Sequence, residues 1–104
     1  MVIPVSIKIP EYKNYQLDAQ IDTRAMSSCY KYKVVQNYYW QPTKVHFKDI
    51  KKQLMKISYV APNFPIYISS TIVYVILYNY DTGSDILLGQ YFVKRHMPMI
   101  GYKD

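Results

Sequence analysis

The chain has 104 residues, half of them hydrophobic, which suits one small globular domain, and we expect a single domain over residues 1–104. Thirteen tyrosines against only three glycines favour strands. The net charge of +6 is compatible with binding nucleic acid or an acidic substrate. The longest apolar run, Ile72 to Tyr78, is too short to span a bilayer, and the single Cys29 excludes an internal disulfide.

Alternating apolar and polar residues predict three strands in the first third of the chain. Residues Val2 to Ile9 alternate, and Pro4 cannot donate to a ladder, so we expect an edge strand or an arm. Residues Tyr15 to Ile21 have the period of a half-buried strand, which then delivers Asp22 at its end. A third strand is expected over Tyr30 to Val35.

A hairpin is expected in the middle of the chain. Lys44 to Lys48 and Leu54 to Val60 form its strands, and Asp49 to Lys52 forms its tip. The tip has no Gly or Asn to supply a positive φ, so a loop of four or five residues fits better than a tight turn. A short helical turn over Lys48 to Met55 is the competing interpretation. The lysine cluster here suits a solvated hairpin tip about as well as a binding patch: Lys48, Lys51, Lys52 and Lys56.

The C-terminal part is predicted to hold further strands and the chain's one convincing helix. Thr71 to Tyr80 carries apolar residues on both faces, which is typical of a central strand. The helix carries Lys94 and Arg95 at its C-terminal end, where cations are favoured. The other elements expected are a turn at Ala61 to Pro65, a strand at Ile66 to Ser69, a buried apolar run at Ile86 to Gly89, the helix at Gln90 to Arg95 and a last strand at Met97 to Gly101.

Asp22 is the residue on which the functional interpretation depends. A carboxylate just past an apolar strand sits on rigid backbone and can face a cleft, which suits general acid and base chemistry. The alternative for Asp22-Thr23-Arg24-Ala25 taken alone is an ordinary acid in a surface turn.

A second motif far downstream supports the catalytic interpretation. Ile86-Leu87-Leu88-Gly89 follows the first motif by about 65 residues. This pair of motifs resembles the retropepsins, the aspartic proteases of retroviruses and their relatives. The stretch from Asp81 to Phe92, with Cys29 after the first motif, is similar to the proteases of plant pararetroviruses, the caulimoviruses and badnaviruses. We expect a protease segment from a bacilliform pararetrovirus of the rice tungro type.

The resemblance implies an all-β closed barrel with a short C-terminal helix, acting as a homodimer. Each subunit would contribute Asp22 as its catalytic residue, with Thr23, Arg24 and Ala25 supporting the active site. The dimer would interleave the terminal strands, Val2 to Ile9 and Met97 to Tyr102. A hairpin flap would bind a polyprotein peptide through Phe47, Lys48, Asp49, Ile50 and Lys51. One Asp in each chain cannot act as both acid and base, whereas a two-fold axis brings two together.

Asp81-Thr82-Gly83-Ser84 spells the aspartic protease signature more faithfully than the stretch at Asp22 does. The resemblance argues against it, because the family's second apolar-Gly run comes some sixty residues after the catalytic Asp. We therefore interpret Asp81 as a turn residue. Asp85 is expected to cap the helix or to pair with a base.

Arg24 departs from the resemblance, because the family has Gly at this position. Gly permits close backbone approach, whereas Arg brings a side chain and a permanent charge to both sides of the two-fold axis. A cation near the two carboxyls would lower their pKa and remove the general acid. The chain is therefore expected to be weakly active or inactive, or to be an engineered variant.

The remaining reactive residues carry no clear chemistry. Cys29 is interpreted as a small buried residue, with a redox-sensitive thiol as the alternative. His46 and His96 stand at no metal-ligand spacing, so no metal or other cofactor is expected. No secretion leader is visible, and the resemblance implies the host cytoplasm or the virion. The alternative functions are an inactive protease-like dimerisation module and a basic β domain that binds single-stranded nucleic acid, the latter not favoured.

Overall fold

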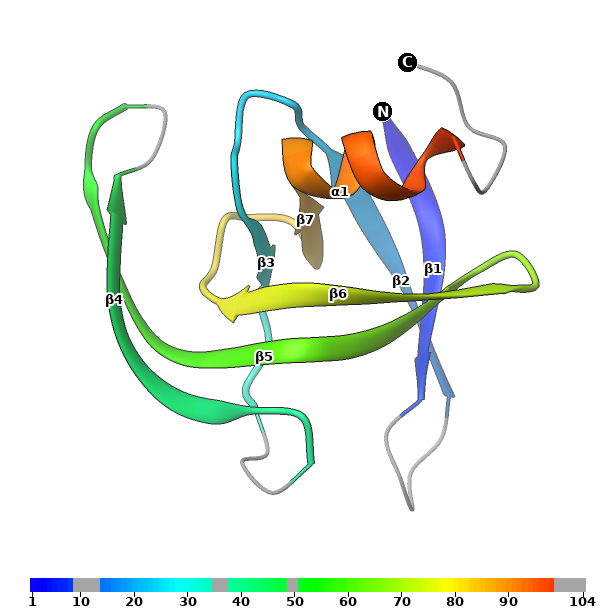
Figure 1. The fold of residues 1–104 in the computed structure, drawn as a ribbon, viewed down its shortest axis with the longest axis horizontal. Helices are drawn as coiled ribbons and strands as arrows, with labels where there is room; N and C mark the ends of the chain where they lie inside the picture. Colours follow the sequence, from blue (N-terminus) through cyan, green and yellow to red (C-terminus); the bar gives the residue numbers. More distant parts are fainter. Residues whose placement is uncertain (9–13, 35–37, 49–50, 99–104) are drawn as a thin grey trace.

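The computed structural model describes residues 1–8, 14–34, 38–48 and 51–98. Most of these residues lie in strands, as the alternating sequence predicts (Figure 1). The strands are β1 (Val2–Lys8), β2 (Asn14–Ile21), β3 (Ser28–Tyr30), β4 (Gln41–Lys48), β5 (Leu54–Ile68), β6 (Thr71–Asn79) and β7 (Ile86–Leu88), and the helix is α1 (Gln90–His96).

Six of the strands close into a barrel. Their order is β1-β2-β7-β3-β6-β5, and β5 returns to β1 through the pair Ser6 and Tyr67. The seventh strand, β4, pairs only with β5 and forms a hairpin that leaves the barrel at one side (Figure 1). The expected all-β closed barrel with one short C-terminal helix is therefore confirmed.

The barrel interior is filled by the inward rows of the strands and by one side of α1. Each row follows the two-residue period of a strand, so the apolar residues of β1, β5 and β6 meet in one cluster. The helix closes this cluster with Phe92 and Val93, and Met97 follows at its C-terminus. The rows are Ile3, Val5 and Ile7 from β1, Phe64, Ile66 and Ile68 from β5, and Val73, Val75 and Leu77 from β6.

Two expected elements are wrong, and a third is wrong in its described part. The strand expected over Tyr30 to Val35 is instead the shorter β3, which starts earlier because it sits between β7 and β6 and pairs with both. The turn expected at Ala61 to Pro65 is part of the long β5, where a β-bulge between Ala61 and Phe64 accommodates Pro62 and Pro65 pairs with Tyr74 of β6. Of the last expected strand, Met97 caps α1 instead, and residues 99–101 lie outside the described part.

The central hairpin is confirmed, with longer strands than expected. Its tip at Asp49 and Ile50 lies outside the described residues, and Lys52 beside it has a positive φ of 62°. The competing helical turn over Lys48 to Met55 is wrong, because Lys48 pairs with Leu54 and Phe47 pairs with Met55 across the two strands. Within the described part of the chain, no helix is long and apolar enough to cross a membrane.

Candidate active site

The barrel brings the two sequence motifs into direct contact. β2 and β7 run parallel, with Ile21 beside Leu88, so Asp22 follows its strand at the point where β7 ends. The Asp22 amide donates to the Leu88 carbonyl at 3.0 Å. Parallel pairing of segments far apart in the sequence therefore fixes the backbone at Asp22.

The turn after Asp22 is fastened to the start of α1. The Gln90 amide donates to the Ala25 carbonyl at 2.7 Å, and the Gly89 amide donates to the Ser28 hydroxyl at 3.0 Å. Within the turn, the Ala25 amide donates to the Asp22 carbonyl at 3.2 Å. The turn is thus held from both sides by backbone hydrogen bonds.

Gly89 is needed here for close approach. A Cβ atom at this position would lie 2.6 Å from the Ala25 carbonyl oxygen and 2.7 Å from that of Ser27. Both neighbours are backbone atoms, which cannot move aside as a side chain can. The second motif ends in Gly because the Asp22 turn packs directly on it.

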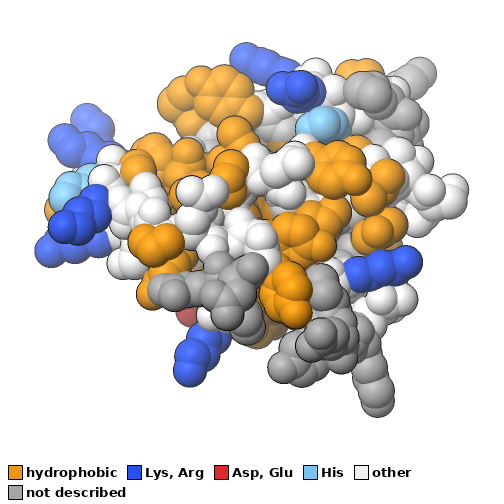
Figure 2. All heavy atoms as spheres, turned by 60° about the horizontal axis from the view of Figure 1, so that its bottom comes forward, with side chains coloured by type: hydrophobic (Ala, Val, Ile, Leu, Met, Phe, Trp, Pro, Cys, Tyr) orange, Lys and Arg blue, Asp and Glu red, His pale blue; other side chains and the backbone are white. Residues whose placement is uncertain are grey.

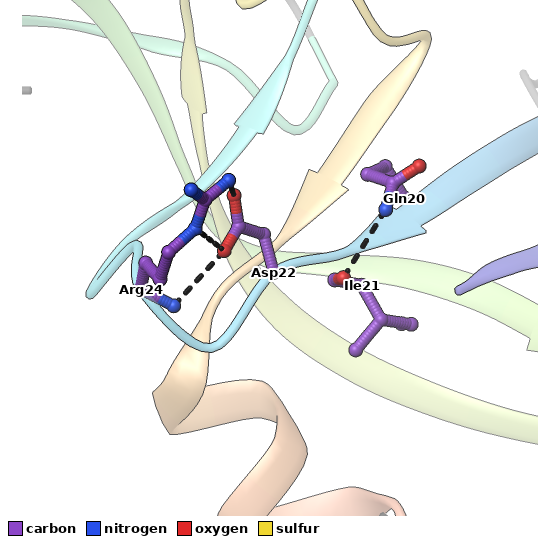
Figure 3. Close-up of polar contacts among 4 residues, drawn as sticks. All are labelled: Gln20, Ile21, Asp22 and Arg24. Atoms are coloured by element: carbon purple, nitrogen blue, oxygen red, sulfur yellow. Dashed lines mark hydrogen bonds and ion pairs between the residues drawn. The ribbon is translucent and has the colours of Figure 1, made fainter. Parts of the chain in front are cut away.

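The Asp22 carboxylate is bound by Arg24 of the same chain (Figure 3). Arg24 Nε donates to Oδ1 at 3.0 Å and Nη2 donates to Oδ2 at 3.1 Å, while the Arg24 amide also donates to Oδ1 at 3.0 Å. The side chain of Asp22 is 18% exposed and that of Arg24 is 71% exposed. These hydrogen bonds, the Arg24 side chain's above all, lower the pKa of Asp22.

The hairpin packs its inner face beside this turn. A second apolar cluster joins Met55 and Ile57 of β5 to Cys29 of β3, with Leu87 of β7 against it. Phe47 of β4 lies edge-on to Tyr78, with the ring centroids 4.9 Å apart. The hairpin is therefore anchored on β3, β6 and β7, the last of which also positions Asp22.

Comparison with known protein families identifies the family to which this chain belongs. Over residues 1–104, the chain matches the family described as Cauliflower mosaic virus peptidase (A3). The chain belongs to this family. The resemblance to pararetrovirus proteases is thereby confirmed at the level of the family, and the chain is identified as a viral peptidase. A comparison with curated proteins finds no match.

The predicted site residues of this viral peptidase fall into two groups. The structure brings Asp22, Thr23, Arg24 and Ala25 against the second motif, with Thr23 exposed in the single chain. In the hairpin group, Phe47 packs inward, whereas Lys48 and Lys51 are exposed. Asp49 and Ile50 lie outside the described residues.

Two acids near the second motif have structural partners. Asp81 Oδ1 accepts from the Gly83 amide at 2.8 Å, and Gly83 has a φ of +98°, which agrees with the expected turn role. Asp85 was expected to cap α1 or to pair with a base; the cap is wrong, because Gly89 is the N-cap and has no side-chain hydrogen bond. Asp85 accepts from the Tyr32 hydroxyl and from the Asp18 amide, and the hydrogen bond from Tyr32 lowers its pKa most. The charge of Lys31 makes a minor contribution to lowering the pKa of Asp85.

Three buried groups complete the site's surroundings. Cys29 is buried, and burial raises its pKa to about 11, so it behaves as a small apolar residue. The Ser28 hydroxyl accepts a hydrogen bond from the Gly89 amide. The sequence analysis did not predict this role, because no local sequence pattern indicates it. His96 Nδ1 is buried without a hydrogen-bond partner in the described part of the chain, and burial lowers the pKa of His96. Among the described residues, no group of His, Cys, Asp and Glu could hold a metal ion.

Proposed function

We propose that this viral peptidase is a homodimeric aspartic endopeptidase that processes a viral polyprotein. The observation that carries the proposal is the Asp22 turn, which hydrogen-bonds to the end of β7 and packs on Gly89. These two contacts hold the turn in place, and the Asp22 side chain is partly exposed at the end of β2. The proposal extends to a segment of a polyprotein acting in the host cytoplasm or the virion.

Two subunits are needed because each supplies one Asp22. Two carboxyls that meet across a two-fold axis cannot both ionise, so one keeps a proton and the other acts as the base. The base takes a proton from a water molecule, whose oxygen attacks the peptide carbonyl carbon. The acid supplies a proton to the carbonyl oxygen, and a proton later passes to the leaving amine nitrogen. The pair titrates as one unit.

The rest of the dimer follows from the same symmetry. Thr23 is exposed in the single chain, and we propose that it meets its copy beside the axis. The hairpin is proposed to close over the peptide with Phe47 to Lys51. The terminal segments are proposed to interleave. β1 is paired with β2 along its whole length and with β5 only at Ser6, so further pairing would use its other edge on either side of Ser6.

The test is cleavage of a peptide library by the dimer, with Asp22→Asn as the decisive variant. Asparagine keeps the shape of the side chain and cannot act as the base, so cleavage should fall by at least about a thousandfold. Asp81→Asn is the matched control and should cleave at the normal rate, because Asp81 serves a turn. An unchanged rate in Asp22→Asn would rule out the proposal.

A second candidate is a catalytically inactive dimerisation module, and the Arg24–Asp22 ion pair favours it. The guanidinium engages both carboxylate oxygens, which stabilises the ionised form that the acid of a pair must give up. Arg24→Gly separates the two candidates. Cleavage that appears or increases in this variant supports the peptidase, whereas an intact dimer without cleavage supports the inactive module.

A further inference from the structure

The two faces of the β4–β5 hairpin differ in chemistry. The inner residues Val45, Phe47, Met55 and Ile57 pack on the barrel. The outer residues are exposed and basic, and we call them the basic face: Lys44, His46, Lys48 and Lys56. Figure 2 shows Lys, Arg and His side chains gathered at the hairpin end of the molecule.

The strand register sets the spacing of this face. Lys44, His46 and Lys48 stand two residues apart on β4, which is roughly 6.6 Å between neighbours for a strand. Lys56 lies across from His46 on β5, and so stands diagonal to Lys48. The Lys48–Lys56 diagonal spans about 7–8 Å, within the screening length of about 8 Å in physiological salt, whereas Lys44 and Lys48 stand roughly 13 Å apart on the same strand.

Among the residues that the structure describes, no hydrogen bond or ion pair joins an acidic side chain to Lys44, Lys48 or Lys56. Asp49 is the one acidic residue in the sequence between Asp22 and Asp81, and it lies outside the described residues. Asp22 is bound by Arg24, and Asp85 accepts a hydrogen bond from Tyr32. Lys48 and Lys56 carry like charges at diagonal positions on one sheet face, and their repulsion costs stability in the free protein.

We propose that the basic face binds the phosphate backbone of nucleic acid. Lysines at regular spacing match a ligand that carries one charge in each repeat. Leu54 is the one large apolar side chain among the described residues of the outer rows, which gives a peptide little to pack on. The outer rows hold no exposed Phe, Tyr or Trp ring among those residues, so we expect binding to depend on the backbone more than on the bases.

Lys44, His46 and Lys56 of this face lie outside the residues proposed to bind the peptide, whereas Lys48 belongs to both sets. A ligand on the outer rows does not enter the space that the inner rows cover, and it screens the repulsion between Lys48 and Lys56. The hairpin is thereby stabilised against the barrel. If the proposed peptidase function holds, on which this one consequence rests, a nucleic acid ligand at low salt should increase the cleavage rate.

The binding test uses the full chain with Asp22→Asn, so that it does not depend on cleavage. Fluorescence anisotropy follows a labelled single-stranded oligonucleotide of mixed sequence over a range of salt concentrations. If three lysines contact phosphates of a single strand, the logarithm of the binding constant should fall with the logarithm of the salt concentration with a slope of about −2. Raising the salt from about 50 to about 150 mM should then lower the affinity roughly ninefold. Adding Lys44→Gln and Lys56→Gln should reduce that change to about twofold.

The matched control removes the same charge elsewhere. Lys94→Gln with Arg95→Gln on α1 lowers the net charge equally, and its salt slope should stay at the parent value. Equal losses in both double variants would overturn the proposal, because net charge alone would then account for binding. Displacement of the oligonucleotide by poly-glutamate at the same charge concentration would also overturn it.

A second measurement needs no hairpin substitution. Acetylation of lysines in the Asp22→Asn protein, read by mass spectrometry, should show Lys44, Lys48 and Lys56 protected by the oligonucleotide while Lys94 is not. Uniform protection, or none, would contradict a site on the hairpin. Failure here leaves the peptidase proposal standing, since that proposal is tested by cleavage.

Discussion

Arg24 binds the Asp22 carboxylate through both of its oxygens, with Nε 3.0 Å from Oδ1 and Nη2 3.1 Å from Oδ2. This two-pronged geometry is the one in which a guanidinium binds a carboxylate most strongly. Arg24 has no positive φ, so its backbone accommodates a side chain without strain. The departure from Gly therefore acts through charge and through the space that the side chain takes.

Removing this guanidinium should raise the pKa of Asp22. The Arg24 side-chain hydrogen bond is the main cause of the lowered value, so Arg24→Gly should move the pKa of Asp22 up toward its ordinary 3.8. Carboxyl NMR of labelled aspartate measures the change. Arg24→Lys keeps the charge without the two-pronged geometry and should give an intermediate value. Identical titration in all three proteins would contradict this account of the pair.

Stability should fall on acidification because of Asp22 and Asp85. Both have a lowered pKa in the folded protein, so their contribution is full above the unfolded value near 3.8 and is lost as the pH falls through the folded values. Urea unfolding from pH 6 to about pH 2 measures this loss. Asp22→Asn with Asp85→Asn should unfold with a shallower acid dependence, and an equally steep one would refute the assignment.

Gly89→Ala should destabilise the protein by about 1–3 kcal/mol, because its Cβ would overlap backbone atoms of the Asp22 turn. The cleavage rate should fall with it. Gly83→Ala is the matched control, since its Cβ meets nothing within 4 Å but its φ of +98° strains any side chain. That variant should lose about 1–2 kcal/mol and keep its rate. Equal rates in both variants would show that the turn does not rely on Gly89.

The Cys29 thiol should react slowly in the folded protein. Its pKa of about 11, against an ordinary 9.0, lowers the thiolate fraction at pH 8 about a hundredfold, and burial slows access further. Labelling with a disulfide reagent, before and after unfolding in urea, measures the difference. Met26→Cys in a Cys29→Ala background places a thiol at an exposed position and should react quickly when folded. Fast labelling of folded Cys29 would mean that the second cluster opens readily.

The sequence correctly predicted the elements that depend on residues close together in the chain. The alternation in β1 and β2 predicts strands directly, since each places one row toward the core. In β6 the strand was expected from apolar residues on both faces, yet only one face is buried, and Ile72, Tyr74 and Ile76 are exposed. Sequence reasoning failed at Ala61 to Pro65, where prolines suggest a turn and a bulge between β5 and its neighbour keeps the strand continuous. It also failed at β3, whose position depends on two partners distant in the sequence.

The residue types of this chain determined by themselves a β-rich chain, an acid at a strand end and a cation two residues later that lowers its pKa. Only the tertiary structure decided that Asp22 meets Leu88, that Gly89 lies against the turn and that the hairpin's lysines share one face. The physical reason is that periodicity is a property of neighbours along the chain. Pairing between distant strands depends instead on how the whole barrel closes.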